Sequence, residues 1–450
     1  MRQLAQPTTE ERGRRTVGRP TSGGDGQMSK VRSRKSDVGR QTAQSSVVGH
    51  QSSILHHPAL SIALLTGGDD KPYVLGLAEA LTSAGVLIDV IGSNDLELPT
   101  LLNNSRVNFL NLRGDQRPEA SPLAKAIRVL RYYAKLILYA GTAKPKLFHI
   151  LWNNKFELFD RTVLMLYYRL LGKKIAFTAH NVNMRRRDGT DSWLNRWSLR
   201  TQYRLADHIF VHTDKMKAEL VADFGVAENK VSVIPFGINN TAPKTDLTSC
   251  DAKRMLGIAD TDKTILCFGQ LAPYKGLEYL VAAFAKVLKQ DGNYRLIIAG
   301  KPKWNHAYWE RIEQLMTDNG VRHRVIERIE HVPDEQTELY FKAADVLVLS
   351  YTQVFQSGVI FLGYGFGLPA IVADVGSLKE EVIEGETGFV CKPRDSSDLA
   401  RVIRKYFDSD LFRNLETRRL EIKAYANERY SWSKVATITA ATYVDLLRSC

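Results

Sequence analysis

Apolar positions follow two alternating spacings along the chain from residue 61 onward. Short apolar runs bounded by Gly, Asn or Asp predict buried strands, and longer segments between them place apolar residues at the helical period. The strands predicted in the first half read SIALLT (61–66), VLIDVIG (86–92), VNFLNL (107–112), LFHILW (147–152), KIAFTAH (174–180) and HIFVHT (208–213). This alternation is typical of βαβ units, in which helices cover both faces of a parallel sheet.

A second series of the same kind starts at residue 264. Its strands read TILCFGQ (264–270), YRLIIAG (294–300), RVIERI (324–329), DVLVLSY (345–351), PAIVADV (369–375) and GFVCKP (388–393). Residues 234–253, between the two series, are rich in Pro, Gly, Asn and Thr and follow neither period. Such a stretch predicts a linker between two domains.

We therefore expect an α/β protein with two doubly wound, Rossmann-like domains that face a central cleft. The expected segments are a first domain at 56–238, a linker at 239–262, a second domain at 263–428, and a C-terminal helix at 429–450 that packs back on the first domain. Sheets of this kind bind ligands outside the carboxyl ends of their strands. The loops after the strands are therefore the places to expect chemistry.

Composition sets the N-terminus apart from the rest of the chain. The chain has 450 residues, of which 44% are hydrophobic and 25% charged, as in ordinary globular proteins. The first 50 residues, rich in Ser, Gly, Thr and Gln, contain no apolar run and carry ten basic and four acidic side chains. They predict a disordered basic tail over residues 1–55. Met28 leaves a second interpretation open, in which translation starts there and part of the tail is never made.

The formal net charge of +13 indicates an anionic partner, such as nucleic acid, a membrane or a phosphorylated ligand. Nearly half of this surplus lies in the tail, which has no aromatic residue, so we do not expect nucleic acid. The four cysteines lack the spacing of a zinc site or a disulfide framework, which fits a reducing cytoplasm. No run reaches the roughly 18 apolar residues of a membrane-spanning helix. We expect a cytoplasmic protein.

Residues 121–140 predict an amphipathic helix with two distinct faces. Its apolar stripe consists of Leu123, Ile127, Leu130, Ala134 and Ile137, and its basic face consists of Lys125, Arg128, Arg131 and Lys135. Such a helix can lie on an anionic lipid surface, which would place the protein peripherally on the inner face of the cytoplasmic membrane. The alternative is an ordinary surface helix that packs its apolar stripe on the sheet.

Two loops of the first domain carry candidate chemistry. Gly67 and Gly68 follow the first strand, and paired glycines either bring backbone close to a ligand or form an ordinary tight turn. His180 ends a later strand, where it is placed to bond a phosphate or a sugar hydroxyl, or simply a backbone carbonyl. The arginines at 185–187 either form a solvated loop or grip a phosphorylated acceptor in bidentate fashion.

Two loops of the second domain suggest anion binding. Lys275 precedes Gly276 where a helix begins, a position that puts an ammonium beside a diphosphate, although Lys-Gly is also a common turn. Ser357 is suited to cap the next candidate helix, and Gly358 leaves its first N–H groups accessible to an anion. The plain alternative is a capped helix packed under the sheet.

Longer segments resemble a known family. FGQLAPYKGLEYLVAAF, YFKAADVLVLSY and QSGVIFLGYGFGLPAIVADVGSLKEEV resemble the donor-binding domain of family 4 glycosyltransferases, retaining enzymes of GT-B fold. FTAHNV, YRLADHIFVHTDKMKAEL and KVSVIPFGI are similar to that family's first domain, so the resemblance covers roughly residues 60–448. It implies transfer of a sugar from a nucleotide-sugar to a glycan or lipid-linked acceptor, in cell-surface polysaccharide or glycolipid synthesis. No metal and no cofactor are expected besides the nucleotide-sugar co-substrate.

The resemblance also implies roles for individual residues. It makes His180 a contact of the donor sugar and Lys275 a diphosphate-binding lysine, and we expect these two to be catalytic. The expected donor-binding residues are Gly67, Gly68, Gln270, Gly276, Gln356, Ser357 and Gly358. The expected acceptor-binding residues are Asn181, Arg185, Arg186 and Arg187.

The chain departs from the family at two places. The usual Glu-x7-Glu motif is replaced by Val354 and Leu362 around a Gln-Ser-Gly loop, where Gln353 or Gln356 is left to contact the sugar. Gln270 stands where the family has an arginine that partners Lys275. These departures keep open an alternative function, a non-catalytic nucleotide-sugar sensor or assembly protein on the same fold. A GT-B epimerase would need carboxylate acid and base pairs that these loops do not offer.

Overall fold

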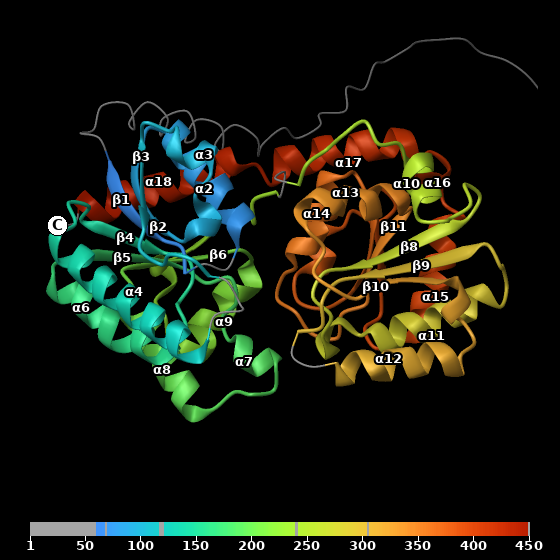
Figure 1. Ribbon diagram of the computed structural model, residues 1–450, viewed down its shortest axis with the longest axis horizontal. Helices are drawn as coiled ribbons and strands as arrows, with labels where there is room; N and C mark the ends of the chain where they lie inside the picture. Colours follow the sequence, from blue (N-terminus) through green and yellow to red (C-terminus); the bar gives the residue numbers. More distant parts are fainter. Residues whose placement is uncertain (1–59, 68–69, 117–120, 239–241, 304–305, 449–450) are drawn as a thin grey trace, which may run out of the picture. The chain divides into compact units, whose positions relative to one another are not determined.

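The computed structural model describes residues 60–448 except 68–69, 117–120, 239–241 and 304–305. The expected tail at 1–55, Met28 and Gly68 lie outside the described residues. Two parallel sheets with helices on their faces confirm the predicted pair of Rossmann-like domains (Figure 1).

The sheet of the first domain has the strand order β3-β2-β1-β4-β5-β6-β7. Its strands are β1 (Ser61–Leu65), β2 (Leu87–Gly92), β3 (Val107–Asn111), β4 (Leu147–Ile150), β5 (Lys174–Thr178), β6 (His208–Val211) and β7 (Val231–Val233). The helices are α2 (Lys71–Ser83), α3 (Pro99–Leu102), α4 (Pro122–Thr142), α5 (Glu157–Phe159), α6 (Met165–Leu170), α7 (Met184–Arg187), α8 (Trp193–Leu205) and α9 (Asp214–Phe224). Separate apolar clusters fill the two faces of this sheet.

The sheet of the second domain has the order β10-β9-β8-β11-β12-β13. Its strands are β8 (Lys263–Phe268), β9 (Tyr294–Ala299), β10 (Val325–Arg328), β11 (Val346–Leu349), β12 (Ala370–Ala373) and β13 (Gly388–Cys391). Its helices are α11 (Leu277–Leu288), α12 (Ala307–Asp318), α13 (Asp334–Ala343), α14 (Gly358–Gly365), α15 (Ser396–Phe407), α16 (Asp410–Arg413) and α17 (Leu415–Arg429). Helix α10 (Ser249–Met255), inside the segment expected as a linker, buries Ala252 in the core of this domain.

The last helix, α18 (Trp432–Arg448), runs beside α2 of the first domain (Figure 1). Its buried Tyr443 hydroxyl bonds Nδ1 of His149 in β4. The Trp432 indole lies so close to Gly76 and Gly237 that a Cβ at either glycine would fall 2.1 or 2.3 Å from the ring. Glycine at these two positions therefore lets the indole wedge between α2 and the segment after β7.

Helix α4 turns a different face to the sheet from the one that its apolar stripe suggests. Tyr132, Tyr133 and Leu136 are buried against the sheet, whereas Leu123 and Leu130 are 71% and 64% exposed. Of the stripe, Ile137 packs against the core, but the other four residues are exposed, so the interpretation of α4 as a helix that packs its whole stripe on the sheet is wrong. Tyr132 and Tyr133 fill that space instead. Among the described helices, none combines the length and the apolar character that crossing a membrane requires.

Candidate functional site

Both sheets reverse their strand order at one point, between β1 and β4 in the first domain and between β8 and β11 in the second. At such switch points the loops after neighbouring strands diverge and leave a crevice for a ligand. Gly67 follows β1, Lys275 lies in the loop after β8, and Ser357 lies in the loop after β11. These three sequence-predicted residues therefore lie at the switch points of the two sheets.

In the first domain, Trp152, a residue that we did not predict, lies against both Gly67 and His180. Gly67 has φ of +62°, and a Cβ there would fall 2.5 Å from the Trp152 carbonyl oxygen, so only glycine fits. The Trp152 indole stacks on the His180 imidazole with ring centroids 4.1 Å apart and planes at 3°. Tyr73 meets the same imidazole edge-on at 4.7 Å. The orientation of the His180 ring is therefore fixed by packing.

A second histidine determines where His180 carries its proton. His212 Nδ1 lies 3.3 Å from the Ile234 carbonyl oxygen, and His212 Nε2 lies 2.9 Å from His180 Nδ1. Burial lowers the pKa of His212 to about 4 and holds the pKa of His180 well below its ordinary value, so both rings are neutral near pH 7. A carbonyl only accepts, so His212 donates from Nδ1 and accepts at Nε2.

His180 must therefore donate from Nδ1, which leaves a lone pair on its Nε2. This buried nitrogen has no hydrogen-bond partner within the described part of the chain. A buried acceptor without a partner is costly, and a ligand hydroxyl that donates to it removes that cost. The arrangement suits His180 to hold a sugar hydroxyl.

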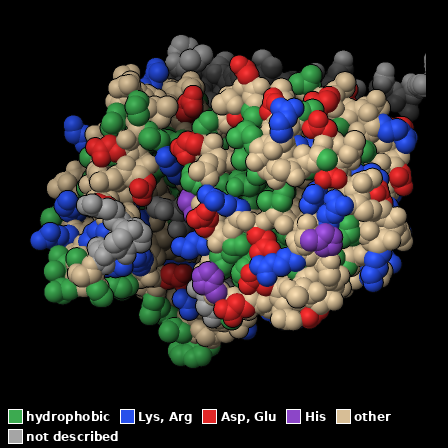
Figure 2. Space-filling model, turned by 45° about the vertical axis from the view of Figure 1, so that its right-hand side comes forward, with side chains coloured by type: hydrophobic (Ala, Val, Ile, Leu, Met, Phe, Trp, Pro, Cys, Tyr) green, Lys and Arg blue, Asp and Glu red, His purple; other side chains and the backbone are tan. Residues whose placement is uncertain are grey.

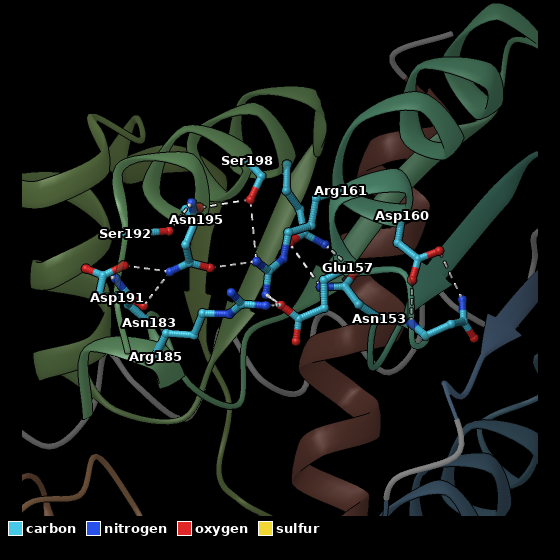
Figure 3. A network of polar contacts seen from close by, with 12 residues as sticks. Asn153, Glu157, Asp160, Arg161, Asn183, Arg185, Asp191, Ser192, Asn195 and Ser198 are labelled. Atoms are coloured by element: carbon cyan, nitrogen blue, oxygen red, sulfur yellow. Dashed lines mark hydrogen bonds and ion pairs between the residues drawn. The ribbon is translucent and has the colours of Figure 1, made fainter. Parts of the chain in front are cut away.

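A cavity of about 310 Å³ lies beside His180 and is lined by two of the four predicted acceptor residues. Asn181 and Arg185 contribute to its wall, together with Asn153, Glu157 and Arg161. The Glu157 carboxylate holds both guanidinium groups at 3.0 Å, and Arg161 also donates to Asn195 Oδ1 at 2.8 Å (Figure 3). A wall of amides and paired charges suits a ligand rich in hydroxyl groups.

The three adjacent arginines of α7 lie in three different surroundings. Arg185 lines this cavity and pairs with Glu157. Arg186 is exposed and pairs with Asp223 of α9 at 2.8 Å. Arg187 bonds the carboxylate of Asp188 through Nε and Nη2 at 2.8 and 3.3 Å. The structure therefore does not bring the three arginines together as one acceptor site.

In the second domain, Lys275 and Ser357 lie on two sides of Tyr351. Lys275 Nζ donates to the Phe268 carbonyl at 2.8 Å and lies 5.3 Å from the centre of the Tyr351 ring, and the Tyr351 hydroxyl lies 3.2 Å from Ser357 Oγ. Lys275 is only 3% exposed, and burial lowers the pKa of its ammonium. Gly276 has φ of +64°, and a Cβ there would fall 2.4 Å from the Ser350 carbonyl oxygen.

Ser357 occupies the N-cap position of α14, but its hydroxyl bonds Tyr351 and does not cap the helix. The exposed Gly358 follows directly. The first-turn N–H groups of α14 are thus not taken by a capping side chain, which favours an anion there.

Gln270 is exposed and lines a cavity of about 300 Å³ at the ends of β8, β9 and β10. Leu362 forms part of the same wall, and Val354 is buried in the core, so the two positions that usually carry glutamate offer this site no hydrogen bond. Gln356 does not line this cavity, and its Nε2 donates to the buried Glu381 carboxylate at 3.0 Å. Lys275 does not line this cavity, but a Cβ at Gly269 in its wall would lie 3.1 Å from Lys275 Nζ.

Sequence patterns did not single out Trp152, His212 or Lys303, although Trp152 and Lys303 line the 310 Å³ cavity. Each lies at or near the carboxyl end of a strand, β4, β6 and β9 respectively. A search for aromatic or titratable residues within a few positions of each predicted strand end would have found all three. Among the described residues, no group of three His, Cys, Asp or Glu side chains is placed to hold a metal ion.

Two family models match the chain. The model of glycosyltransferase family 4 matches residues 72–241, and the model of group 1 glycosyl transferases matches residues 251–429. The D-inositol 3-phosphate glycosyltransferase of Corynebacterium efficiens is 30% identical over 248 residues, which are 53% of this chain and 57% of that protein. The chain thus spans little more than half the length of such curated relatives.

Solved structures share the fold over most of the chain. The sucrose-phosphate synthase of Thermosynechococcus elongatus is similar with a TM-score of 0.68 and 21% identity, over 87% of this chain and all of that one. Anabaena HepE, solved in complex with UDP-glucose, gives a TM-score of 0.66 and 17% identity, again over 87% of this chain and all of that one. The two family models match one Rossmann-like domain each, and together with the shared fold they support a group 1 glycosyltransferase of GT-B fold.

Proposed function

We propose that this protein transfers a sugar from a nucleotide diphosphate-sugar to a hydroxyl of a glycan or lipid-linked acceptor, with the anomeric configuration retained. The observation that carries the proposal is the placement of Lys275 and Ser357 around Tyr351 at the switch point of the second sheet, at the uncapped start of α14. HepE, which shares the fold, was solved with UDP-glucose, which supports a nucleotide-sugar donor. Cell-surface polysaccharide or glycolipid synthesis is the process we expect.

In this transfer reaction the protein's main task is to stabilise the leaving diphosphate. The bond between the anomeric carbon and the phosphate oxygen breaks, and the acceptor oxygen bonds to the same face of that carbon. The acceptor proton passes to the leaving phosphate, so no carboxylate base is needed. Lys275 and the N–H groups that begin α14 take up the negative charge that develops on the phosphate oxygens. In this scheme no metal ion is required for charge neutralisation.

On the sugar side, His180 Nε2 accepts a hydrogen bond from a hydroxyl of the transferred sugar. The acceptor enters through the 310 Å³ cavity lined by Asn153, Asn181 and Arg185. His180 also lines that cavity, so donor sugar and acceptor meet at its ring.

Exposed apolar side chains on α4 and its neighbour α6 suggest where the acceptor comes from. Leu123, Leu130 and Leu138 of α4 are 71%, 64% and 70% exposed, and Leu170 of α6 is 78% exposed. The two helices touch, with the Tyr167 hydroxyl donating to the Ile137 carbonyl at 3.1 Å. Hydrophobic and basic side chains lie next to one another at the lower left of Figure 2. We propose that α4 rests on an anionic lipid surface and that the acceptor is drawn from it.

The test is donor binding followed by turnover. Thermal unfolding of the full chain with UDP-, GDP- and ADP-sugars should show a raised transition temperature with one of them, because a ligand of the native state stabilises it. Release of the free nucleotide on addition of lipid-linked or glycan acceptors then identifies the enzyme. Binding without turnover across many acceptors would instead favour the nucleotide-sugar sensor. The presence of Val354 and Leu362 in place of the two usual glutamates also favours that alternative.

A further inference from the structure

A partly buried ion cluster joins the two domains close to Lys275. Arg187, at the end of α7, bonds Asp188 through two nitrogens at 2.8 and 3.3 Å, and Lys303, which follows β9, donates to the same carboxylate at 2.8 Å. The side chains of Arg187, Asp188 and Lys303 are 9%, 11% and 16% exposed. One carboxylate of the first domain is thus shared between a cation of each domain.

The ring of Tyr274 connects this cluster to the diphosphate lysine. The Arg187 guanidinium carbon lies 4.5 Å from the centre of the Tyr274 ring, and Lys303 Nζ lies 5.6 Å from it. Tyr274 directly precedes Lys275 and meets Tyr351 edge-on at 6.0 Å. Lys275 Nζ approaches that second ring at 5.3 Å. Three cations from both domains therefore border two adjoining aromatic rings.

Different acceptors hold the cations of this cluster. Arg187 and Lys303 share one carboxylate, and the Lys275 ammonium donates to a carbonyl. Burial by itself raises the pKa of Asp188, but the hydrogen bonds from Arg187 and Lys303 outweigh it, so the pKa lies below its ordinary value and the group stays ionised. The buried Lys275 ammonium, held by a neutral carbonyl, favours an anionic ligand beside it.

We infer that Arg187 is a ligand of the donor diphosphate, supplied across the cleft by the domain that binds the acceptor. Its planar guanidinium matches two phosphate oxygens at once, as it now matches the two oxygens of Asp188. Arg187 thereby supplies the second cation that the second domain lacks at Gln270. Asp188 holds the guanidinium in place before the nucleotide arrives. This inference rests on the proposed function, and it removes Arg187 from the acceptor site.

The neighbouring Arg186 offers a matched control. It lies on the same short helix, is 59% exposed and pairs with Asp223 and Glu219 of α9, remote from Tyr274 in its contacts. Loss of Arg186 removes the same charge from the chain without touching the cluster.

The experiment is calorimetric titration of the full chain with UDP, GDP and ADP, and with the corresponding nucleoside. Arg187→Ala should weaken binding of the preferred nucleoside diphosphate by at least about tenfold and leave nucleoside binding unchanged, because only the phosphate contact is lost. Arg187→Lys should fall between Arg187→Ala and wild type, and Arg186→Ala should bind like wild type. Thermal unfolding establishes that each variant is folded.

Two results would overturn the inference. One is wild-type nucleotide affinity in Arg187→Ala while Lys275→Ala loses it, which leaves the proposed function standing. The other is equal loss of nucleoside and diphosphate affinity, which marks Arg187 as structural. If the wild-type chain binds no nucleoside diphosphate at all, it is the proposed function that fails.

Discussion

His212 Nε2 accepts a hydrogen bond from His180 Nδ1 at 2.9 Å, and this contact leaves the lone pair of His180 on Nε2. His212 is itself anchored on the Ile234 carbonyl, so the order of donors runs in one direction only. If His180 holds the donor sugar through that lone pair, then His212 is a positioning residue for it.

We therefore expect His212→Ala to lower kcat/KM roughly tenfold, the equivalent of one lost buried hydrogen bond. His212→Gln should restore most of the activity, because its amide offers both an acceptor for His180 and a donor for Ile234. The pKa of His180 is held low by burial and by His212, so His212→Ala should move the acid limb of the pH profile toward neutral pH. Unchanged pH profiles in all three proteins would contradict this role.

Gly67 makes a second prediction with its own control. An alanine at Gly67 combines positive φ with a Cβ 2.5 Å from the Trp152 carbonyl, whereas Gly85 has φ of +89° and nothing within 4 Å of its Cβ. Gly85→Ala should cost about 1 kcal/mol of unfolding free energy from backbone strain alone. Gly67→Ala should cost more than about 2 kcal/mol, because Trp152 must also move.

Urea unfolding measures the free energy of unfolding of both glycine variants. Because Trp152 stacks on His180, Gly67→Ala should also reduce turnover, while Gly85→Ala should leave it intact. Equal losses of stability in the two variants would show that close approach to Trp152 is unimportant.

Helix α4 gives a prediction about lipid. Leu130→Glu on α4 should reduce co-sedimentation with anionic phosphatidylglycerol vesicles at least about threefold, because it places charge on the exposed apolar stripe. Leu420→Glu on α17 is the control, since Leu420 is 66% exposed and Leu130 is 64% exposed. Equal vesicle binding by the two variants would contradict a lipid-binding role for α4. So would wild-type binding to neutral phosphatidylcholine vesicles that is as strong as binding to phosphatidylglycerol vesicles.

Local patterns sufficed for the two sheets, because each buried parallel strand is an apolar run whose ends are marked by Gly, Asn or Asp. They also singled out Gly67, His180, Lys275 and Ser357, which lie in the loops after β1, β5, β8 and β11. The partners of these residues were not predictable in the same way. His212 and His180 are 32 positions apart and meet only when β5 pairs with β6.

Two further features needed the assembled fold. Periodicity predicts that α4 has an apolar stripe, but it does not show that Tyr132 and Tyr133 on the other face fill the space at the sheet. The adjacent arginines Arg185, Arg186 and Arg187 look alike in sequence. Only tertiary contacts separate them, because α7 ends where the first domain meets Tyr274 of the second.

The most direct measurement is the affinity of the full chain for UDP-, GDP- and ADP-sugars, compared between wild type, Lys275→Met and Lys289→Ala. Lys275→Met keeps the length of the buried side chain and removes its charge, and Lys289 is an exposed lysine after α11. We predict that one nucleotide-sugar binds wild type and Lys289→Ala equally and binds Lys275→Met at least about tenfold more weakly. Binding of none of the three, or wild-type affinity in a folded Lys275→Met, would contradict the account.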